Sequence, residues 1–308
     1  MSTKPSVLIV GTGAMGCLFA ARLAPHAEVT LLGTWVEGVE ALQKGGVRLV
    51  DERGSEQVFS VRATTDPTQC SDVHHALILV KSWQTARAAR QIMACLVKDG
   101  LALTLQNGLG NLEQLQEILG EERAAMGVTT MGATSLGPGW VRVGGVGPTH
   151  LGSHPRLEPF ADLLRQAELE IEIVEDLEGL VWGKLAINAA INPLTALLGI
   201  PNGELLLSPH ALALMTEAAG ETAAVAEARG IRLPYDDPGA AAVEVAGRTA
   251  SNHSSMLQDI RRGAPTEIDA ICGAIANEGE ALGVWTPVNR VFWHLVRALA
   301  SSTQGDSV

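Results

Sequence analysis

Short apolar runs alternate with segments of helical periodicity in the first half of the chain. Each run ends near a glycine or a polar residue and is typical of a strand buried in a parallel sheet. The runs are residues 6–10, 28–33, 76–80 and 101–106. Residues 14–24 have helical periodicity, and helical sequence follows the later runs as well. This alternation predicts right-handed βαβ units and a doubly wound parallel sheet.

The pattern changes twice further along. Residues 124–152 are β-rich and broken by Gly and Pro, and the alternating segment 168–175 predicts a last strand. After about Leu177 strand signals fade and apolar positions recur at helical spacing. The helices expected there are 178–198, 209–229, 239–262, 266–282 and 287–300. We therefore predict an α/β domain over residues 1–176 and an all-helical domain over residues 177–308, with the ligand site between them.

Length and composition agree with two domains. A chain of 308 residues, 46% of them hydrophobic, can bury a core in each half. A net charge of −12 argues against nucleic acid and anionic membranes as partners. No stretch approaches the ~20 apolar residues of a membrane helix. Cys17, Cys70, Cys95 and Cys272 lack metal-ligand spacing. We expect a soluble, cytoplasmic protein with four reduced thiols and no bound metal.

A glycine-rich loop joins the first strand to the first helix. Its residues are Gly11, Thr12, Gly13, Ala14, Met15 and Gly16. In this context Gly11 permits a tight turn, Gly13 lets a pyrophosphate approach the backbone, and Gly16 allows close packing of helix on strand. The helix N-terminus stabilises the anion. The loop predicts a dinucleotide site, with a purely structural turn as the alternative.

The choice of dinucleotide is open from the residues alone. An acid near the end of the second strand indicates NAD, and an arginine there indicates NADP. This strand ends in Gly33, Thr34 and Trp35, which include neither. Glu37 is close, but it is also the kind of first-turn acid that a helix dipole favours.

A polar stripe runs through an apolar segment of the second half. Lys184, Asn188 and Asn192 are spaced i, i+4, i+8, so they share one helix face. Only five of the chain's 22 basic residues are lysines, and a desolvated lysine, unlike arginine, can release its proton. Buried ammonium and amide groups need partners. The stripe indicates a site for an oxygen-rich anion, with a structural network between helices as the alternative. Pro193 should kink this helix.

Three more polar residues are candidates for ligand contacts. Lys81 and Asn107 each follow an apolar strand, at the edge where parallel sheets hold ligands. Asn107-Gly108 is also a common turn pair. Glu267 follows Thr266, so helix capping and a favoured first-turn position are alternative explanations for it.

Six segments together resemble the ketopantoate reductase family. They are GTGAMG at 11–16, VKSWQ at 80–84, QNGLGN at 106–111, WGKLAINAAINPLTALLGIPNGEL at 182–205, SSMLQD at 254–259 and PTEID at 265–269. They occur in family order over nearly the whole chain. The resemblance implies a Rossmann-like domain followed by an all-α domain of the 6-phosphogluconate dehydrogenase type. It also implies reduction of 2-dehydropantoate to pantoate by NADPH, a step toward pantothenate and coenzyme A.

The same resemblance implies a role for individual residues. Lys184 would be the general acid that protonates the substrate carbonyl oxygen. The substrate's hydroxyl and carboxylate would be held by Asn188, Asn192, Asn202 and Ser255. Asn107 would lie between cofactor and substrate. The remaining cofactor contacts would come from the glycine loop, Lys81, the backbone of Ala133, and Glu267 on the nicotinamide side.

Three departures from the family pattern keep other functions open. Many relatives carry arginine where Thr34 stands, arginine where Ala264 stands, and asparagine where Cys272 stands, although Arg261 and Arg262 lie near the second position. One alternative is a D-2-hydroxyacid dehydrogenase that uses NADH on another branched or bulky 2-oxoacid. The other is a non-catalytic dinucleotide sensor. The alanine-rich helical half is compatible with a homodimer.

Overall fold

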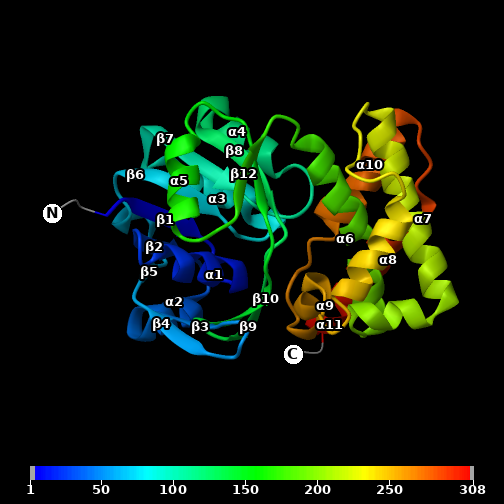
Figure 1. Ribbon diagram of the computed structural model, residues 1–308, viewed down its shortest axis with the longest axis horizontal. Coiled ribbons are helices and arrows are strands. Elements are labelled where there is room, and N and C mark those ends of the chain that lie inside the picture. The colour runs from blue at the N-terminus through cyan, green and yellow to red at the C-terminus, as the bar shows by residue number, and fades with distance from the viewer. Residues whose placement is uncertain (1–3, 306–308) are drawn as a thin grey trace. The chain divides into compact units, whose positions relative to one another are not determined.

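The computed structural model describes residues 4–305, and the chain divides into two compact units (Figure 1). The first unit comprises the chain up to Gln106 and Gly110–Leu177. The second comprises Asn107–Leu109 and the chain from Glu178 onward. This division falls one residue after the predicted boundary. It also assigns three residues of the first half to the helical unit, which the sequence pattern did not indicate.

Eight strands of the first unit form one sheet, in the order β12-β11-β8-β7-β6-β1-β2-β5. They are β1 (Ser6–Val10), β2 (Glu28–Leu32), β5 (Arg62–Thr64), β6 (Val73–Ile78), β7 (Leu96–Thr104), β8 (Ala124–Thr129), β11 (Thr149–Gly152) and β12 (Ile171–Val174). Neighbours are parallel, except that β8 and β11 are antiparallel. The interior strands are buried on both faces, which explains their nearly continuous apolar runs.

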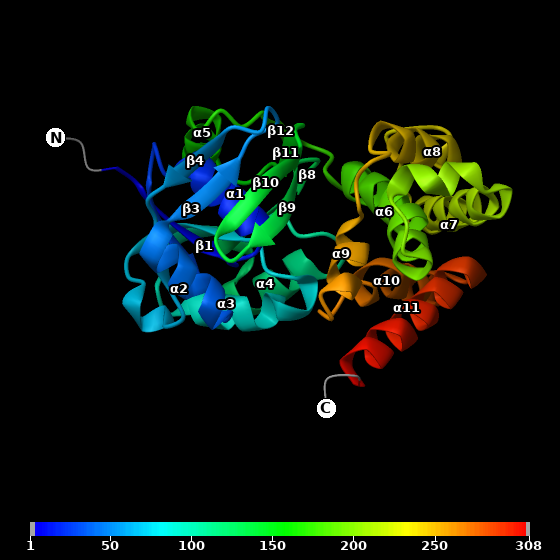
Figure 2. The same cartoon turned by 90° about the horizontal axis from the view of Figure 1, so that it is seen from below.

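Helices cover both faces of this sheet (Figure 2). On the face of Val7 and Ile9 pack α1 (Ala14–Leu23) and α5 (Glu158–Gln166). On the face of Leu8 and Val10 pack α3 (Thr85–Met93) and α4 (Asn111–Leu119). The predicted doubly wound sheet is therefore confirmed.

A second sheet in the first unit was not predicted. Its order is β4 (Glu56–Phe59), β3 (Val47–Val50), β10 (Trp140–Gly145) and β9 (Gly132–Gly137). Three of these strands, β3, β9 and β10, contact α1. The helix that follows the glycine loop is thus covered by the small sheet as well as by the large one, and most of its residues are buried.

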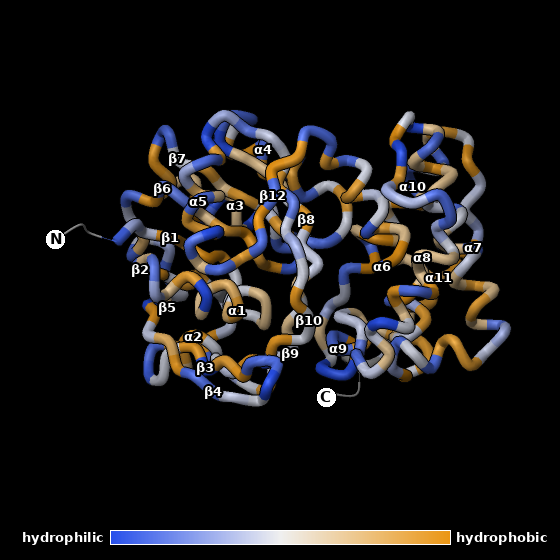
Figure 3. Tube along the Cα trace, in the orientation of Figure 1, coloured by the Kyte–Doolittle hydropathy of each residue, from blue (hydrophilic) through white to orange (hydrophobic). Residues whose placement is uncertain are grey.

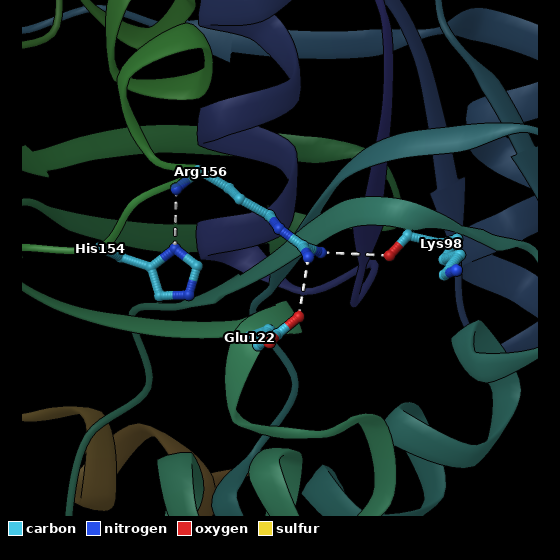
Figure 4. A network of polar contacts seen from close by, with 4 residues as sticks. All are labelled: Lys98, Glu122, His154 and Arg156. Atoms are coloured by element: carbon cyan, nitrogen blue, oxygen red, sulfur yellow. Dashed lines mark hydrogen bonds and ion pairs between the residues drawn. The ribbon is translucent and has the colours of Figure 1, made fainter.

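Arg156 ties the loop before α5 to two distant segments (Figure 4). Its Nη1 donates to the carbonyl of Lys98 at 3.1 Å and its Nη2 to Glu122 at 3.0 Å. Its backbone N–H donates to Nδ1 of His154 at 3.1 Å. Lys98 lies near the start of β7, the end of the strand opposite to the carboxyl edge where ligands bind. An exposed ion pair of this kind contributes about 1 kcal/mol or less, so we assign the network to local stability.

The second unit is helical, as predicted. Its helices are α6 (Glu178–Leu198), α7 (Pro209–Ala228), α8 (Pro238–Arg248), α9 (Ser255–Arg261), α10 (Ala274–Leu282) and α11 (Pro287–Gly305). Alanines such as Ala189 on α6 and Ala218 on α7 are fully buried in its core. Their small side chains let the helix backbones approach closely, which accounts for the alanine-rich composition of this half.

Two helices differ from the predicted ones. The single helix expected over 239–262 is interrupted between Arg248 and Ser255. Ser254 ends the interruption because its hydroxyl accepts the N–H of Leu257 at 3.0 Å and so caps α9. The helix expected over 266–282 becomes regular only at Ala274, after a π-helical turn over Asp269–Gly273. The helix α6 continues through Pro193, and the kink expected there stays a prediction.

Hydrophobic residues line the interior strands and helices of both units, and hydrophilic ones gather in the outer loops (Figure 3). All four cysteines are buried free thiols. Within residues 4–305, no helix combines the length and apolarity needed to traverse a bilayer.

Candidate active site

The three glycines of the loop between β1 and α1 differ in how much space a side chain would have. Gly11 has φ +127°, and a Cβ there would lie 2.7 Å from the carbonyl oxygen of Leu79. A Cβ on Gly16 would overlap the carbonyl of Gly11. At Gly13, which begins α1, a Cβ would meet nothing within 4 Å. Two glycines are therefore required by packing, whereas Gly13 leaves open space at a helix N-terminus. That space suits the pyrophosphate of a dinucleotide.

The rest of the loop completes this cradle. Thr12 is buried, and Ala14 and Met15 form the partly buried first turn of α1. A Cβ on Gly33, at the end of β2, would collide with the side chain of Thr12. The loop and the end of the neighbouring strand thus pack tightly, and any ligand lies outside them.

The edge beside this loop holds three residues considered in the sequence analysis and one that was not. Lys81 is half-buried, directly before a short 3-10 turn over Ser82–Gln84. Thr34 is exposed after β2, and Nη2 of Arg87 lies 3.4 Å from its hydroxyl. Glu37 is exposed in the first turn of α2 (Val36–Gly45). No sequence signal links Arg87 to Thr34, because 53 residues separate them.

Ala133 lies on β9 in the small sheet. It pairs with Val143 of β10 and is partly buried against the core of the first unit. Its backbone is therefore held in an antiparallel ladder beside α1, which contacts both strands.

Lys184 and Glu267 form a charged pair in the helical unit. Lys184 stands on α6, and Glu267, which is 6% exposed, precedes the π-helical turn. Desolvation lowers the pKa of Lys184 to about 8, although the nearby carboxylate of Glu267 acts in the opposite direction. Thr266 accepts the N–H of Ile268 at 3.4 Å. This contact does not cap a helix, because the turn over Asp269–Gly273 begins after Ile268 with no side-chain cap, and the carboxylate of Glu267 acts on the lysine.

The backbone beside Lys184 is held by residues that the sequence pattern did not indicate. The hydroxyl of Tyr235 donates to the carbonyl of Gly183 at 2.6 Å. A Cβ on Gly183 would lie 2.7 Å from Cδ of Pro234. Tyr235 is the chain's single tyrosine, which is the one signal that could have drawn attention to it.

The polar stripe continues along α6 and reaches the start of α9. Asn188 is half-buried and Asn192 is 7% exposed. At 1.5 Å per residue, Lys184 and Asn192 lie about 12 Å apart along the axis. One turn further, the hydroxyls of Thr195 and Ser254 are 2.7 Å apart. This contact brings Ser255, the first residue of α9, to the same end of the stripe.

Asn202 is fixed beyond the end of α6. Its Nδ2 donates to the hydroxyl of Thr249 at 2.9 Å, and its backbone N–H donates to the carbonyl of Asn252 at 3.0 Å. Its Oδ1 is buried and accepts no hydrogen bond in the described part of the chain. That oxygen is available to a donor on a ligand, such as a hydroxyl.

The Asn107 loop belongs to the helical unit. Gly108 has φ +83°, and a Cβ there would lie 2.6 Å from the carbonyl oxygen of Ala270. The N–H of Leu109 donates to that same carbonyl at 2.9 Å. Asn107 is thereby held beside the turn that follows Glu267. The positive φ fits the turn-pair explanation, and the same turn brings Asn107 into one unit with Lys184 and Glu267.

The positions that depart from the family pattern are also resolved. Cys272 is fully buried, and burial raises the pKa of its thiol. Arg261 donates to the carbonyl of Gly199 at 2.9 Å, and Arg262 pairs with the buried Asp259 at 2.7 Å. Both arginines therefore have partners of their own within the protein. Across residues 4–305, no three His, Cys, Asp or Glu side chains gather as metal ligands do.

Comparisons with known proteins agree over both units. A model described as ketopantoate reductase PanE/ApbA matches residues 7–156, and its C-terminal counterpart matches residues 176–300. The 2-dehydropantoate 2-reductase of Halobacterium salinarum is 35% identical over 299 residues, covering 94% of this chain and 97% of that protein.

Two solved structures are similar over almost the whole chain. A PanE/ApbA family ketopantoate reductase from Ralstonia eutropha JMP134 has a TM-score of 0.90 at 34% identity, covering 97% of this chain and 99% of the other. A D-mandelate dehydrogenase with NADH and anilino(oxo)acetate has a TM-score of 0.91 at 26% identity, with the same coverage.

Proposed function

Because the chain belongs to the ketopantoate reductase PanE/ApbA family, we propose that it reduces 2-dehydropantoate to pantoate with a reduced nicotinamide dinucleotide. The observation that carries this proposal is the environment of Lys184. Its ammonium is desolvated on α6 beside the buried Glu267, and its pKa is about 8. A general acid works best when its pKa lies near the working pH.

The protein's part in the reaction is to position groups and to supply a proton. The glycine loop would hold the reduced nicotinamide dinucleotide, which would supply the hydride for the carbonyl carbon of the substrate. Negative charge then builds on the carbonyl oxygen, where the Nζ ammonium of Lys184 stabilises it and donates a proton. Glu267 helps to keep that lysine charged before the reaction.

The remaining residues bind the two ligands in this proposal. Substrate hydroxyl and carboxylate groups contact Asn107, Asn188, Asn192, Asn202 and Ser255. The dinucleotide contacts Gly11, Thr12, Gly13, Ala14, Met15, Gly16, Lys81, Asn107, Ala133 and Glu267. The open space at Gly13 and the unused buried acceptor of Asn202 support these assignments.

Initial rates with ketopantoate, measured with NADPH and NADH in parallel, test the proposal. Lys184→Ala should lower turnover by roughly 100-fold or more, as expected for loss of a general acid. Lys44→Ala, which removes an exposed lysine in a surface pair with Glu40, should leave turnover unchanged. Absence of turnover by the wild type with either cofactor would contradict the proposal.

The likeness to D-mandelate dehydrogenase favours one second candidate. A D-2-hydroxyacid dehydrogenase would prefer the 2-oxoacid of mandelate to ketopantoate and would use NADH. The ratio of kcat/KM for the two acids separates the candidates. A non-catalytic sensor would not need an ammonium whose pKa lies near neutrality. The homodimer stays a prediction, which light scattering in solution would test.

A further inference from the structure

The carboxyl ends of three parallel strands meet beside the glycine loop. Val10 of β1 is in register with Leu32 of β2 on one side and with Ile78 of β6 on the other. In sheets of this kind the pyrophosphate lies at the loop after β1, and the adenosine ribose lies at the end of β2. Whatever protein group stands just after Leu32 therefore meets the 2′ position of the ribose. In this chain that group is Thr34, whose side chain carries no charge.

A guanidinium reaches this position from another element. Arg87 lies in the first turn of α3, and its Nη2 is 3.4 Å from the hydroxyl of Thr34. A guanidinium has five N–H donors, and this long contact uses one of them. The Nε of Arg87 is buried and has no acceptor in the described part of the chain.

The charge of Arg87 is also uncompensated. Among residues 4–305, no carboxylate lies within ion-pairing distance of it. The neighbouring arginine on the same helix, Arg90, is exposed and lies one turn further from the loop. In a protein with a net charge of −12, an unpaired guanidinium at the end of β2 indicates an anionic ligand at that point.

We propose that Arg87, together with the hydroxyl of Thr34, binds the 2′-phosphate of NADPH and gives this chain a preference for NADPH over NADH. The inference rests on the proposed function, because it concerns the same dinucleotide site. A guanidinium binds phosphate oxygens through parallel charge-assisted hydrogen bonds. The 2′-hydroxyl of NADH offers no such charge, so the contribution of Arg87 falls on NADPH alone.

Calorimetric titration of NADPH and NADH into the whole protein tests the proposal. Arg87→Ala should raise the Kd for NADPH on the order of 10- to 100-fold and leave that for NADH within about twofold. Arg87→Lys, which keeps the charge but loses the fork, should fall between wild type and Arg87→Ala. Arg90→Ala is the matched control and should change neither Kd.

A second measurement needs no variant. On the wild-type protein, 2′,5′-ADP should bind at least about tenfold more tightly than 5′-AMP. Equal binding of these two nucleotides, or an equal loss of NADPH and NADH affinity in Arg87→Ala, would overturn the role of Arg87. So would a wild type that binds NADH as tightly as NADPH. If the wild type bound neither dinucleotide, the proposed function would fail as well.

Discussion

Lys184 shows how one partly buried helix position can set the pH at which a reaction runs. Its pKa of about 8 follows mainly from desolvation, with Glu267 acting in the opposite direction. In the direction of reduction the ammonium must be protonated. We therefore expect kcat/KM for reduction to fall about tenfold per pH unit above pH 8, and kcat/KM for oxidation to rise through the same range.

Glu267→Gln provides the internal check on this profile. Removing the carboxylate takes away the effect that raises the lysine pKa. The fall in reduction rate should then begin at a lower pH than in the wild type. Profiles measured from pH 6 to 10 that superimpose for the two proteins would refute the effect of Glu267 on the titrating group.

The same lysine should lower the stability of the fold. Its pKa is about 8 in the folded protein and 10.5 without the fold, so below pH 8 the folded state disfavours a charge that the unfolded state carries freely. Lys184→Met should therefore raise the free energy of unfolding at pH 7, by up to about 3 kcal/mol. Wild-type stability should rise with pH between 8 and 10.5 and approach that of the variant. Thermal unfolding at pH 7 and pH 10.5 would show the gap and its closure.

Individual residues differ in how far the sequence predicts them. Lys184, Asn188 and Asn192 follow from helical spacing alone, since the face they share does not depend on the rest of the fold. Arg87 and Tyr235 do not, because their partners Thr34 and Gly183 lie 53 and 52 residues away. Contacts over such separations depend on how elements pack, which local periodicity does not encode.

At the scale of elements, substitutions at two glycines of the first loop distinguish an effect on fold stability from an effect on dinucleotide binding. A Cβ on Gly16 would overlap the carbonyl of Gly11, whereas a Cβ on Gly13 would meet nothing. We expect Gly16→Ala to cost about 1–3 kcal/mol of stability. Gly13→Ala should cost less than about 1 kcal/mol but weaken dinucleotide binding roughly tenfold. Melting curves of the two variants would measure the loss of stability, and cofactor titrations would measure the loss of dinucleotide affinity. A Gly13→Ala variant with wild-type cofactor affinity would count against a ligand at this loop.

The elements themselves were predictable where their pattern is strong. The apolar strands of the large sheet and the long helices α6, α7 and α11 appear in the sequence because burial imposes their periods. The small sheet was missed because β4 is largely exposed and β3 pairs with β10, some ninety residues later. The helix expected over 239–262 was interrupted because Ser254 caps a new helix instead of continuing the old one.

At the scale of the whole molecule, residues 107–109 belong to the helical unit although they lie in the first half of the sequence. Gly108 is the residue that permits this, since its φ is +83° and a Cβ would press on the carbonyl of Ala270. We expect Gly108→Ala to cost about 1–3 kcal/mol and to lower turnover at least tenfold by displacing Asn107.

Gly120→Ala is the control for this substitution. Gly120 also has a positive φ, +92°, but its Cβ position is open. It should therefore lose only the backbone preference at φ +92° and ψ 148°, about 1–3 kcal/mol, and keep full turnover. If both variants had equal activity, the docking of the Asn107 loop would have no functional role.

The placement of residues 107–109 also bears on how new specificities can be made by exchanging parts between relatives. A single crossover at Leu177 would join a helical half from one parent to an Asn107 loop from the other. In such a chimaera Ala270 and Gly108, which lie in contact, would come from different parents. Hybrids that carry residues 107–109 along with their own helical half should fold and function more often than hybrids cut once.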